Sequence, residues 1–299
     1  MTFTLRPHIG NMFSWLLKFV THKKLTLVWW LRPFILYSSN ANAWGLGTHI
    51  YFAHSLIWAM PMLDQRLRQA IKNFPELVMA GACLPDLAVI SNTFNSTHQW
   101  QQGLKLLNTA KQTDSEEDLA IAIGYMSHLY IDVIAHQHFV PAHEALWQHD
   151  SVVTHIAAEW AMDAYLKTIT PQSPSQLLQK NHIILATFVS KYFDCEVAHA
   201  STMLKRLSFW DGVLRRFKIP QLIYNTARLF DRQLKQHFIY YIALTQHAMP
   251  QIKLLLEGDA PVYDAELKAQ SAMEMRLWQA NCLAHLKNLT RKPIAHFNR

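Results

Sequence analysis

Glycine and cysteine are both scarce in this chain of 299 residues. Only 8 residues are glycine, and the apolar side chains recur mostly at three- and four-residue steps, the spacing of helices and not of strands. The three cysteines, Cys83, Cys195 and Cys282, are too few and too scattered for a disulfide framework or a cysteine-type zinc site. With 51% hydrophobic residues, the chain can bury one substantial core. We therefore predict an all-α fold, a single multi-helix bundle domain.

Acidic residues are absent from the first 43 positions, which hold five basic ones: Arg6, Lys18, Lys23, Lys24 and Arg32. Subtracting these five from the 28 basic residues of the whole chain leaves 23 against 21 acidic ones. The overall charge of +7 thus shrinks to +2 for residues 44–299. A nearly neutral body is a poor match for the phosphate backbone of nucleic acids, so we expect no stable nucleic-acid partner.

The same N-terminal segment has the features of an export signal. Lys23 and Lys24 precede an apolar run over residues 25–31, and Ala41-Asn42-Ala43 has the small-x-small pattern of a signal-peptidase site. Cleavage there would leave Trp44 as the new N-terminus. We predict that residues 1–43 are a signal peptide that is removed, and that the mature chain is secreted or periplasmic.

An uncleaved N-terminal anchor is the alternative for this segment. Arg32 and Pro33 interrupt its apolar run, which falls short of the roughly 18–20 residues that span a bilayer. Met12 is an alternative start of the chain. We expect no transmembrane span in the mature protein.

Tandem repeats, glycine-rich phosphate loops and low-complexity tracts are also missing, and nothing suggests nucleotide binding or a Ser-His-Asp triad. Aromatic and basic residues interleave in the last third of the chain: Phe217, Tyr224, Phe230, Phe238, Tyr240 and Tyr241 among Arg215, Arg216, Arg228, Arg232 and Lys235. This pattern fits either a membrane-surface or nucleic-acid patch or the core of a bundle with a charged wet side. We predict the core.

Histidine, in contrast, is abundant, with 17 residues, and it concentrates in the stretch 121–163. His128 and Asp132 are four residues apart, and so are His155 and Glu159. On a helix this separation puts both side chains on one face, a turn apart. Imidazole and carboxylate are zinc ligands, and a carboxylate can bridge two ions. Two such pairs in one short stretch predict a metal site, although any single histidine here could be a hydrogen-bonded core residue.

Between the two pairs lie four more histidines: His136, His138, His143 and His149. Outside the stretch, His49 stands at the start of a predicted helix. Pro85 ends another helix and places Asp86 in a turn, and His98 follows a dozen residues later. An acid on one loop and a histidine on the next can converge on a site; the alternative is that Asp86 only caps a helix.

The central helix is predicted to begin at about Glu117, after a capping-box pattern at Ser115-x-x-Asp118. Gly124 within it costs helix stability. We therefore expect Gly124 to mark a close approach between two helices.

The chain resembles the zinc-dependent phospholipase C family, the helical superfamily that also contains the S1/P1 nucleases and the catalytic part of glycosylphosphatidylinositol phospholipase D. The resemblance rests on five ordered elements: Trp44-Gly45-x-x-x-His49, Pro85-Asp86, Ser96-Thr97-His98, His128-x-x-x-Asp132-x5-His138 and His155-x-x-x-Glu159. It runs from Trp44 to about Leu166, under half of the chain. It implies one helical catalytic domain over 44–299, with the ligand motifs in 44–166 and completing helices in 176–290.

The resemblance also implies three zinc ions. The first would be held by Trp44 (through its amino nitrogen and carbonyl oxygen), His49 and Asp132; the second by Asp86, His98, His128 and the other oxygen of Asp132; the third by His138, His155 and Glu159. His136 would fit the shorter Asp-x3-His spacing of other branches, and we favour His138. Cleavage before Trp44 gains a chemical purpose, because the free amine exists only afterwards.

The activity implied is that of an exported zinc-dependent phosphodiesterase, a phospholipase C that cuts the glycerol–phosphate ester of phospholipids at a membrane surface. Diacylglycerol and a phosphorylated headgroup would be released, with Asp86 as general base. A nuclease of the S1/P1 type is the alternative, since Trp-Gly-x-x-x-His is a nuclease-like spacing, and a non-catalytic helical metal-binding protein is the second alternative. The His-x-x-x-Glu pairing is phospholipase-like. Leu87 stands where choline-selective enzymes carry an aromatic side chain, which leaves the headgroup open.

Overall fold

A computed structural model of the chain describes residues 45–58, 63–148, 151–264, 271–289 and 296–297. The chain divides into two compact units, Met1–Ser39 and Asn40–Arg299, and every described residue belongs to the second. The predicted signal peptide and Trp44 lie outside the described residues. The described residues form helices and contain no strand, so the all-α prediction is confirmed.

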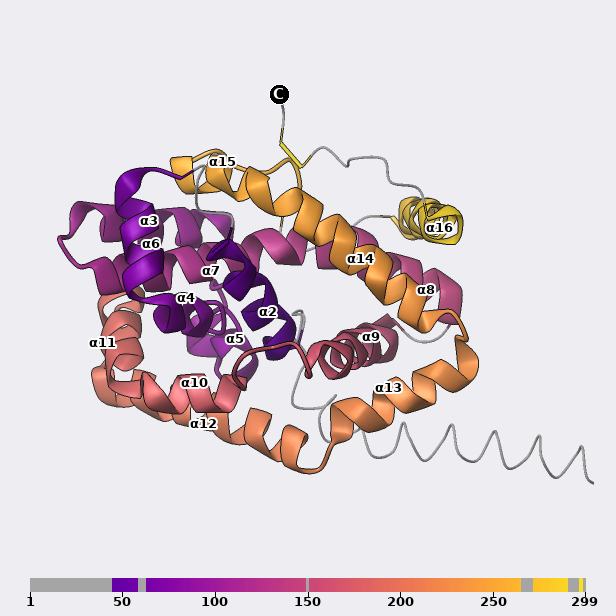
Figure 1. The fold of residues 1–299 in the computed structure, drawn as a ribbon, viewed down its shortest axis with the longest axis horizontal. Coiled ribbons are helices and arrows are strands. Elements are labelled where there is room, and N and C mark those ends of the chain that lie inside the picture. The colour runs from indigo at the N-terminus through magenta and orange to yellow at the C-terminus, as the bar shows by residue number, and fades with distance from the viewer. Residues whose placement is uncertain (1–44, 59–62, 149–150, 265–270, 290–295, 298–299) are drawn as a thin grey trace, which may run out of the picture. The chain divides into compact units, whose positions relative to one another are not determined.

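The helices follow one another along the chain with short connections (Figure 1). They are α2 (Leu46–Leu56), α3 (Gln65–Asn73), α4 (Pro75–Gly81), α5 (Leu87–Ile90), the 3-10 turn η2 (Asn92–Phe94), α6 (Trp100–Gln112), α7 (Glu116–Ile134), the π-helical turn η3 (Ala135–Phe139), α8 (Val140–Trp147), α9 (Ser151–Leu166), α10 (Pro174–Lys180), α11 (His182–Phe193), α12 (Val197–Arg216), α13 (Ile219–Phe230), α14 (Leu234–Ala248), the 3-10 turn η4 (Met249–Gln251), α15 (Ile252–Glu257) and α16 (Ala272–Asn288).

Helix α7 is the core of the domain. Ser115 caps it by accepting a hydrogen bond from the backbone N–H of Asp118 at 3.0 Å, and the helix begins one residue before the predicted position. Its residues from Leu119 to Ile134 are all buried. Among the described residues, only the segment Glu116–Trp147 is long and apolar enough to cross a membrane, and its apolar window is wholly buried inside the protein, as in the core helix of a folded domain.

The crossing of α4 and α7 explains why Asp86 lies near α7. A Cβ atom added to Gly124 would collide with the backbone carbonyl of Val78, and one added to Gly81 would collide with the carbonyl of Ile121. The two backbones therefore touch, as predicted from Gly124. Because α4 ends at this crossing, the turn that follows it carries Asp86 directly to the buried face of α7.

Two further helices, α2 and α9, complete the surroundings of that face. Helix α2 packs against α4, α7 and α9, and α9 packs in turn against α8 and α13 (Figure 1). Residues from α2, from the turn after α4, from α7 and from α9 can therefore meet in one place. Helix α10 packs against α4, α12 packs against α5, α10 and α11, and α16 covers α8.

The aromatic residues of the last third of the chain do not all enter the core. Phe238 and Tyr241 of α14 are 0% and 1% exposed, as predicted. Phe217 and Phe230 are 68% and 60% exposed, so the prediction was wrong for them. Both stand at helix ends, Phe217 just after α12 and Phe230 at the last position of α13, where no following turn of the same helix covers the ring.

Candidate metal centre

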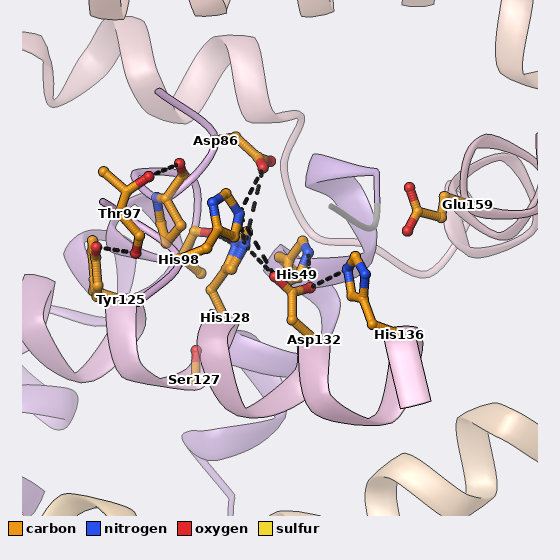
Figure 2. Close-up of polar contacts among 12 residues, drawn as sticks. His49, Asp86, Thr97, His98, Tyr125, Ser127, His128, Asp132, His136 and Glu159 are labelled. Carbon is orange, nitrogen blue, oxygen red and sulfur yellow. Dashed lines mark hydrogen bonds and ion pairs between the residues drawn. The ribbon is translucent and has the colours of Figure 1, made fainter. Parts of the chain in front are cut away.

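His128 and Asp132 form the middle of the centre. Both are fully buried on one face of α7, and His128 Nε2 lies 2.9 Å from Asp132 Oδ2, one turn away. The Nδ1–H of His128 donates a hydrogen bond to the backbone oxygen of Ala82, at 2.8 Å, just after α4. This bond fixes the ring and turns Nε2 toward the centre, as second-shell carbonyls do for metal-binding histidines. Figure 2 shows His128 and Asp132 one turn apart on α7.

Two loop residues meet this pair. His98 Nε2 lies 3.4 Å from His128 Nε2, 3.7 Å from Asp132 Oδ2 and 3.8 Å from Asp86 Oδ1 (Figure 2). A tetrahedral zinc ion with bonds of about 2.0–2.2 Å holds its ligand atoms about 3.3–3.6 Å apart. One ligand atom each from Asp86, His98 and His128 lies within 4.8 Å of the other two, so these three residues are placed to hold one cation, with Asp132 Oδ2 beside both histidines.

Thr97 joins the two loops that carry Asp86 and His98. Its hydroxyl lies 2.6 Å from the backbone oxygen of Pro85 and 2.9 Å from that of Phe94. The hydroxyl of Tyr125 in α7 donates a hydrogen bond to the backbone oxygen of Thr97. These buried contacts anchor both loops to α7. Tyr125 had no local signal in the sequence, because its partner lies 28 positions away.

His49 reaches the same carboxylate from α2. Its Nε2 lies 3.3 Å from Asp132 Oδ1, and its ring stacks on that of His128 with centroids 3.6 Å apart. Asp132 thus directs Oδ2 toward His128 and His98 and Oδ1 toward His49 (Figure 2). A carboxylate placed between two sets of imidazoles is suited to bridge two cations.

A buried carboxylate from α9 anchors the start of α2. Asp163 accepts hydrogen bonds from Thr48 N at 2.6 Å and Thr48 Oγ1 at 3.1 Å. A Cβ atom at Gly45 or Gly47 would come within 2.6 Å or 2.8 Å of the Asp163 side chain, so only glycine lets the chain pass this closely. Arg215 holds Asp163 from the far side, at 2.6 Å. Sequence reasoning missed both charged residues, although the pair of glycines was a local sign of close approach.

The third cluster consists of His136, His155 and Glu159. His155 Nε2 lies 2.9 Å from Glu159 Oε1, one turn along α9. His136 joins them, its ring centroid 4.9 Å from that of His155, and one ligand atom from each residue lies within 4.8 Å of the others. His136 Nε2 also lies 3.9 Å from Asp132 Oδ1, so this cluster adjoins the others (Figure 2).

His138, which the sequence favoured, lies elsewhere. Its ring contacts those of Tyr263, Trp278 and His296, and its backbone oxygen accepts a hydrogen bond from Tyr241. The reason is that the chain stays helical after Asp132: a residue four positions on shares its face, whereas one six positions on is rotated by about 240°. We therefore correct the candidate from His138 to His136.

Burial sets the charge of these groups. It raises the pKa of Asp86 to about 8 and raises that of Glu159, while it lowers the pKa of His98 to about 3 and that of His155 to about 4. Neutral imidazoles have the free lone pair that a metal needs. Asp86 Oδ1 is buried and accepts no hydrogen bond among the described residues. Buried carboxylates facing neutral imidazoles are costly unless a cation compensates them, so the donor set fits zinc.

Comparison with known families identifies the chain. The family model described as zinc dependent phospholipase C matches residues 48–208, more than half of the chain. The comparisons with curated proteins and with solved structures returned no match. The matched region contains His49, Asp86, His98 and the segment from α7 through η3 to α9, which carries His128, Asp132, His136, His155 and Glu159. Trp44 lies outside the matched residues. The chain therefore belongs to the zinc-dependent phospholipase C family, a family of phosphoric diester hydrolases.

Proposed function

We propose that the protein is an exported phospholipase C that hydrolyses the glycerol–phosphate ester of membrane phospholipids. The observation that carries this proposal is the position of Asp132, whose two carboxylate oxygens face different histidines. Three clusters of zinc-type ligands adjoin one another around this carboxylate. Such an arrangement suits a reaction in which a phosphodiester, its nucleophile and its leaving group must be held together.

Three zinc ions are assigned to these clusters in the proposal. Their ligands are His49, Asp132 and the amine of Trp44 for the first, Asp86, His98, His128 and Asp132 for the second, and His136, His155 and Glu159 for the third. The distances between the described ligand atoms support this assignment.

The ions would supply Lewis acidity, a lower pKa for water and compensation of the charge on the phosphoryl oxygens. Asp86 is the proposed general base. It accepts a proton as the water oxygen attacks phosphorus, the bond between phosphorus and the glycerol oxygen breaks, and the proton passes to that oxygen. Diacylglycerol and a phosphorylated headgroup are the products.

A basic and apolar surface supports a membrane as the place of reaction. On α13, Leu222 and Leu229 are 55% and 79% exposed and lie seven positions apart, on one stripe of the helix. We define the α12–α13 face as these two residues with their exposed neighbours Phe217, Phe230, Arg216, Lys218, Arg228 and Arg232. No acidic residue occurs between positions 212 and 230. Anionic membranes bind protein surfaces of this kind, because the apolar side chains enter the lipid boundary while the basic side chains attract the lipid headgroups.

The same face argues against a nucleic acid as the main substrate. Single-stranded nucleic acids are held by aromatic rings that stack on bases, with cations for the backbone. The face contains two rings, Phe217 and Phe230, but both stand at helix ends, and the two residues that share the stripe along α13, Leu222 and Leu229, are aliphatic. Helix α13 also packs against α9, which carries His155 and Glu159, so a membrane bound there would be separated from the third cluster by one helix layer.

Parallel assays on vesicles of phosphatidylcholine, phosphatidylethanolamine and phosphatidylglycerol and on single-stranded DNA test the proposal. We expect diacylglycerol release from vesicles, fastest with the anionic lipid, and little DNA cleavage. Leu222→Ser combined with Leu229→Ser should lower vesicle turnover while sparing a short-chain phospholipid dissolved as monomers. Efficient DNA cleavage without diacylglycerol release would favour the nuclease alternative.

Export and cleavage before Trp44 complete the proposal. The support is the signal-like segment 1–43 and the position of Gly45, which lies against the Asp163 side chain at the start of the helix that carries His49. N-terminal sequencing of the purified protein should begin at Trp44. A protein made with one extra residue before Trp44 should bind less zinc, and unchanged zinc content and activity would remove Trp44 from the ligand set.

A further inference from the structure

A fourth cluster of metal-type ligands lies where α8 meets the turn between α13 and α14. It consists of His143, Asp231 and His237, which are 0%, 8% and 5% exposed. One candidate ligand atom from each lies within 4.8 Å of the other two. Two imidazoles and one carboxylate are a ligand set that zinc uses. The cluster shares no residue with the candidate metal centre.

Hydrogen bonds among the described residues leave one buried nitrogen of His143 without a partner. Its Nδ1–H donates to the backbone oxygen of Phe139 at 2.8 Å, so the lone pair of the neutral ring is on Nε2. That Nε2 is buried and has no hydrogen-bond partner among the described residues. The rings of Trp147, Phe238 and Tyr241 lie around it. A buried hydrogen-bond acceptor among apolar side chains is costly unless it has a partner. An imidazole whose other nitrogen donates to a backbone carbonyl is also oriented as metal-binding histidines usually are.

Asp231 and His237 already face each other. His237 Nδ1 lies 2.8 Å from Asp231 Oδ2, and Asp231 Oδ1 accepts a hydrogen bond from the backbone of Gln233 at 2.9 Å. The pairing lowers the pKa of Asp231 against the opposing effect of burial, so the carboxylate is anionic at neutral pH. A cation bound in place of the proton of His237 would take Nδ1 of His237, an oxygen of Asp231 and Nε2 of His143 as ligands, with the Asp231–His237 pair moving apart to admit it, and His143 Nε2 would gain its missing partner.

We propose that His143, Asp231 and His237 bind one structural divalent cation of the zinc class, in addition to the ions of the candidate metal centre. One carboxylate and two neutral imidazoles leave a net charge of +1 with a divalent ion, and water or the second carboxylate oxygen completes the tetrahedron. The ion ties the α13–α14 turn, which lies beyond the region matched by the family model, to α8 and so to the core helix.

Zinc content measured by mass spectrometry on the full, zinc-loaded protein tests this site. His143→Gln and Asp231→Asn should each lose about one zinc ion per chain relative to the unsubstituted protein. Trp147→Phe is the matched control, because Trp147 packs against the His143 ring but offers no ligand; it should keep the full content. Turnover of a dissolved short-chain phospholipid should stay within about twofold in all three variants, since catalytic ligands are untouched.

Equal zinc content in all four proteins would overturn the proposal, and so would a loss of zinc that always comes with loss of turnover. Crystals of the unsubstituted protein provide a test that does not depend on the variants folding. Diffraction at the zinc absorption edge should give an anomalous peak between His143 and the Asp231–His237 pair. Peaks at the candidate metal centre without one at this position would exclude the fourth ion.

Discussion

Gly124 of α7 touches the backbone carbonyl of Val78 in α4 so closely that a methyl group at position 124 has no room. This contact determines how near the end of α4 comes to α7. Asp86 and Ala82 both follow α4, and they contact His128 through a carboxylate oxygen at 4.0 Å and a backbone oxygen at 2.8 Å. The geometry of the candidate metal centre thus depends on a residue with no side chain.

Replacing Gly124 by alanine should therefore destabilise the protein. Overpacking a dense core costs about 1–3 kcal/mol, which outweighs the gain of about 1 kcal/mol in helix propensity. Gly212→Ala in α12 is the matched control, because its added Cβ would find its nearest neighbour, Ser175 Cβ, at 3.9 Å. Denaturant unfolding should show a loss for Gly124→Ala and no loss for Gly212→Ala. Equal stability of the two variants would contradict the close crossing.

Asp132→Asn and Asp86→Asn should have different effects. Asp132 faces two clusters, so its amide variant should lose most of the bound zinc and all measurable turnover. Asp86→Asn should keep most of the zinc, while turnover falls by about 10²–10⁴-fold, the usual contribution of a general base. Zinc analysis beside a steady-state assay separates the two outcomes. If both variants lose metal and activity in parallel, Asp86 contributes through metal binding alone and is not the base.

His136→Ala should remove about one zinc ion per chain, because His136 is the residue beside His155 and Glu159. His138→Ala is the natural comparison, since both residues are buried in the same π-helical turn. We expect His138→Ala to keep its zinc and to lose only packing against Tyr263 and Trp278. The opposite result would restore the ligand choice that the sequence favoured.

Arg215 joins two buried carboxylates, so its removal should be costly. Its Nε lies 2.8 Å and 3.0 Å from the oxygens of Asp211, and a terminal nitrogen lies 2.6 Å from Asp163. Arg215→Met would leave both acids without their cation, at a cost of about 3–5 kcal/mol. The neighbouring Arg216 is exposed, and Arg216→Met should change the stability by less than about 0.5 kcal/mol. Thermal unfolding of the two variants would show the difference; similar melting temperatures would mean that the acids are stabilised by other groups.

The sequence was most informative where geometry is local. His128 with Asp132 and His155 with Glu159 lie on single helix faces because a four-residue step returns to the same side of a helix, whatever the rest of the fold does. Gly124 was also interpretable, because a glycine inside an apolar helix has few other uses. The all-α class followed from the same periodicity.

The sequence was least informative where the outcome depends on distant partners. Choosing between His136 and His138 required knowing that the helix continues past Asp132, which the pattern of residues does not reveal. Asp163 and Arg215 are 52 positions apart, and nothing local marks either one as the support of α2. The exposure of Phe217 and Phe230 depends on where α12 and α13 end, and helix ends are the least predictable boundaries.

Removing zinc should make the protein increasingly unstable as the pH rises from about 7.5 to 9. Without a cation, burial raises the pKa of Asp86 from 3.8 to about 8. Burial opposes protonation of His128, but the charge of Asp132 prevails and raises its pKa from 6.5 to about 9. A group whose pKa is higher in the folded than in the unfolded protein stabilises the fold fully at pH values below its unfolded pKa. That stabilisation is lost as the pH rises through its pKa in the folded protein. The stabilisation from Asp86 is lost between pH 3.8 and about pH 8, and that from His128 between pH 6.5 and about pH 9. Both groups therefore lower the stability as the pH rises across this window.

Histidines whose pKa burial lowers, such as His98 with about 3 and His155 with about 4, act in the opposite direction near pH 6.5, because their unfolded imidazoles are still half protonated there. Above about pH 7.5 these imidazoles are neutral in both states, so their opposition is small. Melting temperatures of chelator-treated protein at pH 7.5, 8.2 and 9.0 should therefore fall steadily. In excess zinc the carboxylates and imidazoles face cations at every pH, so the melting temperature should be higher and nearly constant. A chelated protein whose melting temperature rises with pH would mean that these buried groups do not depend on a cation for their charge balance.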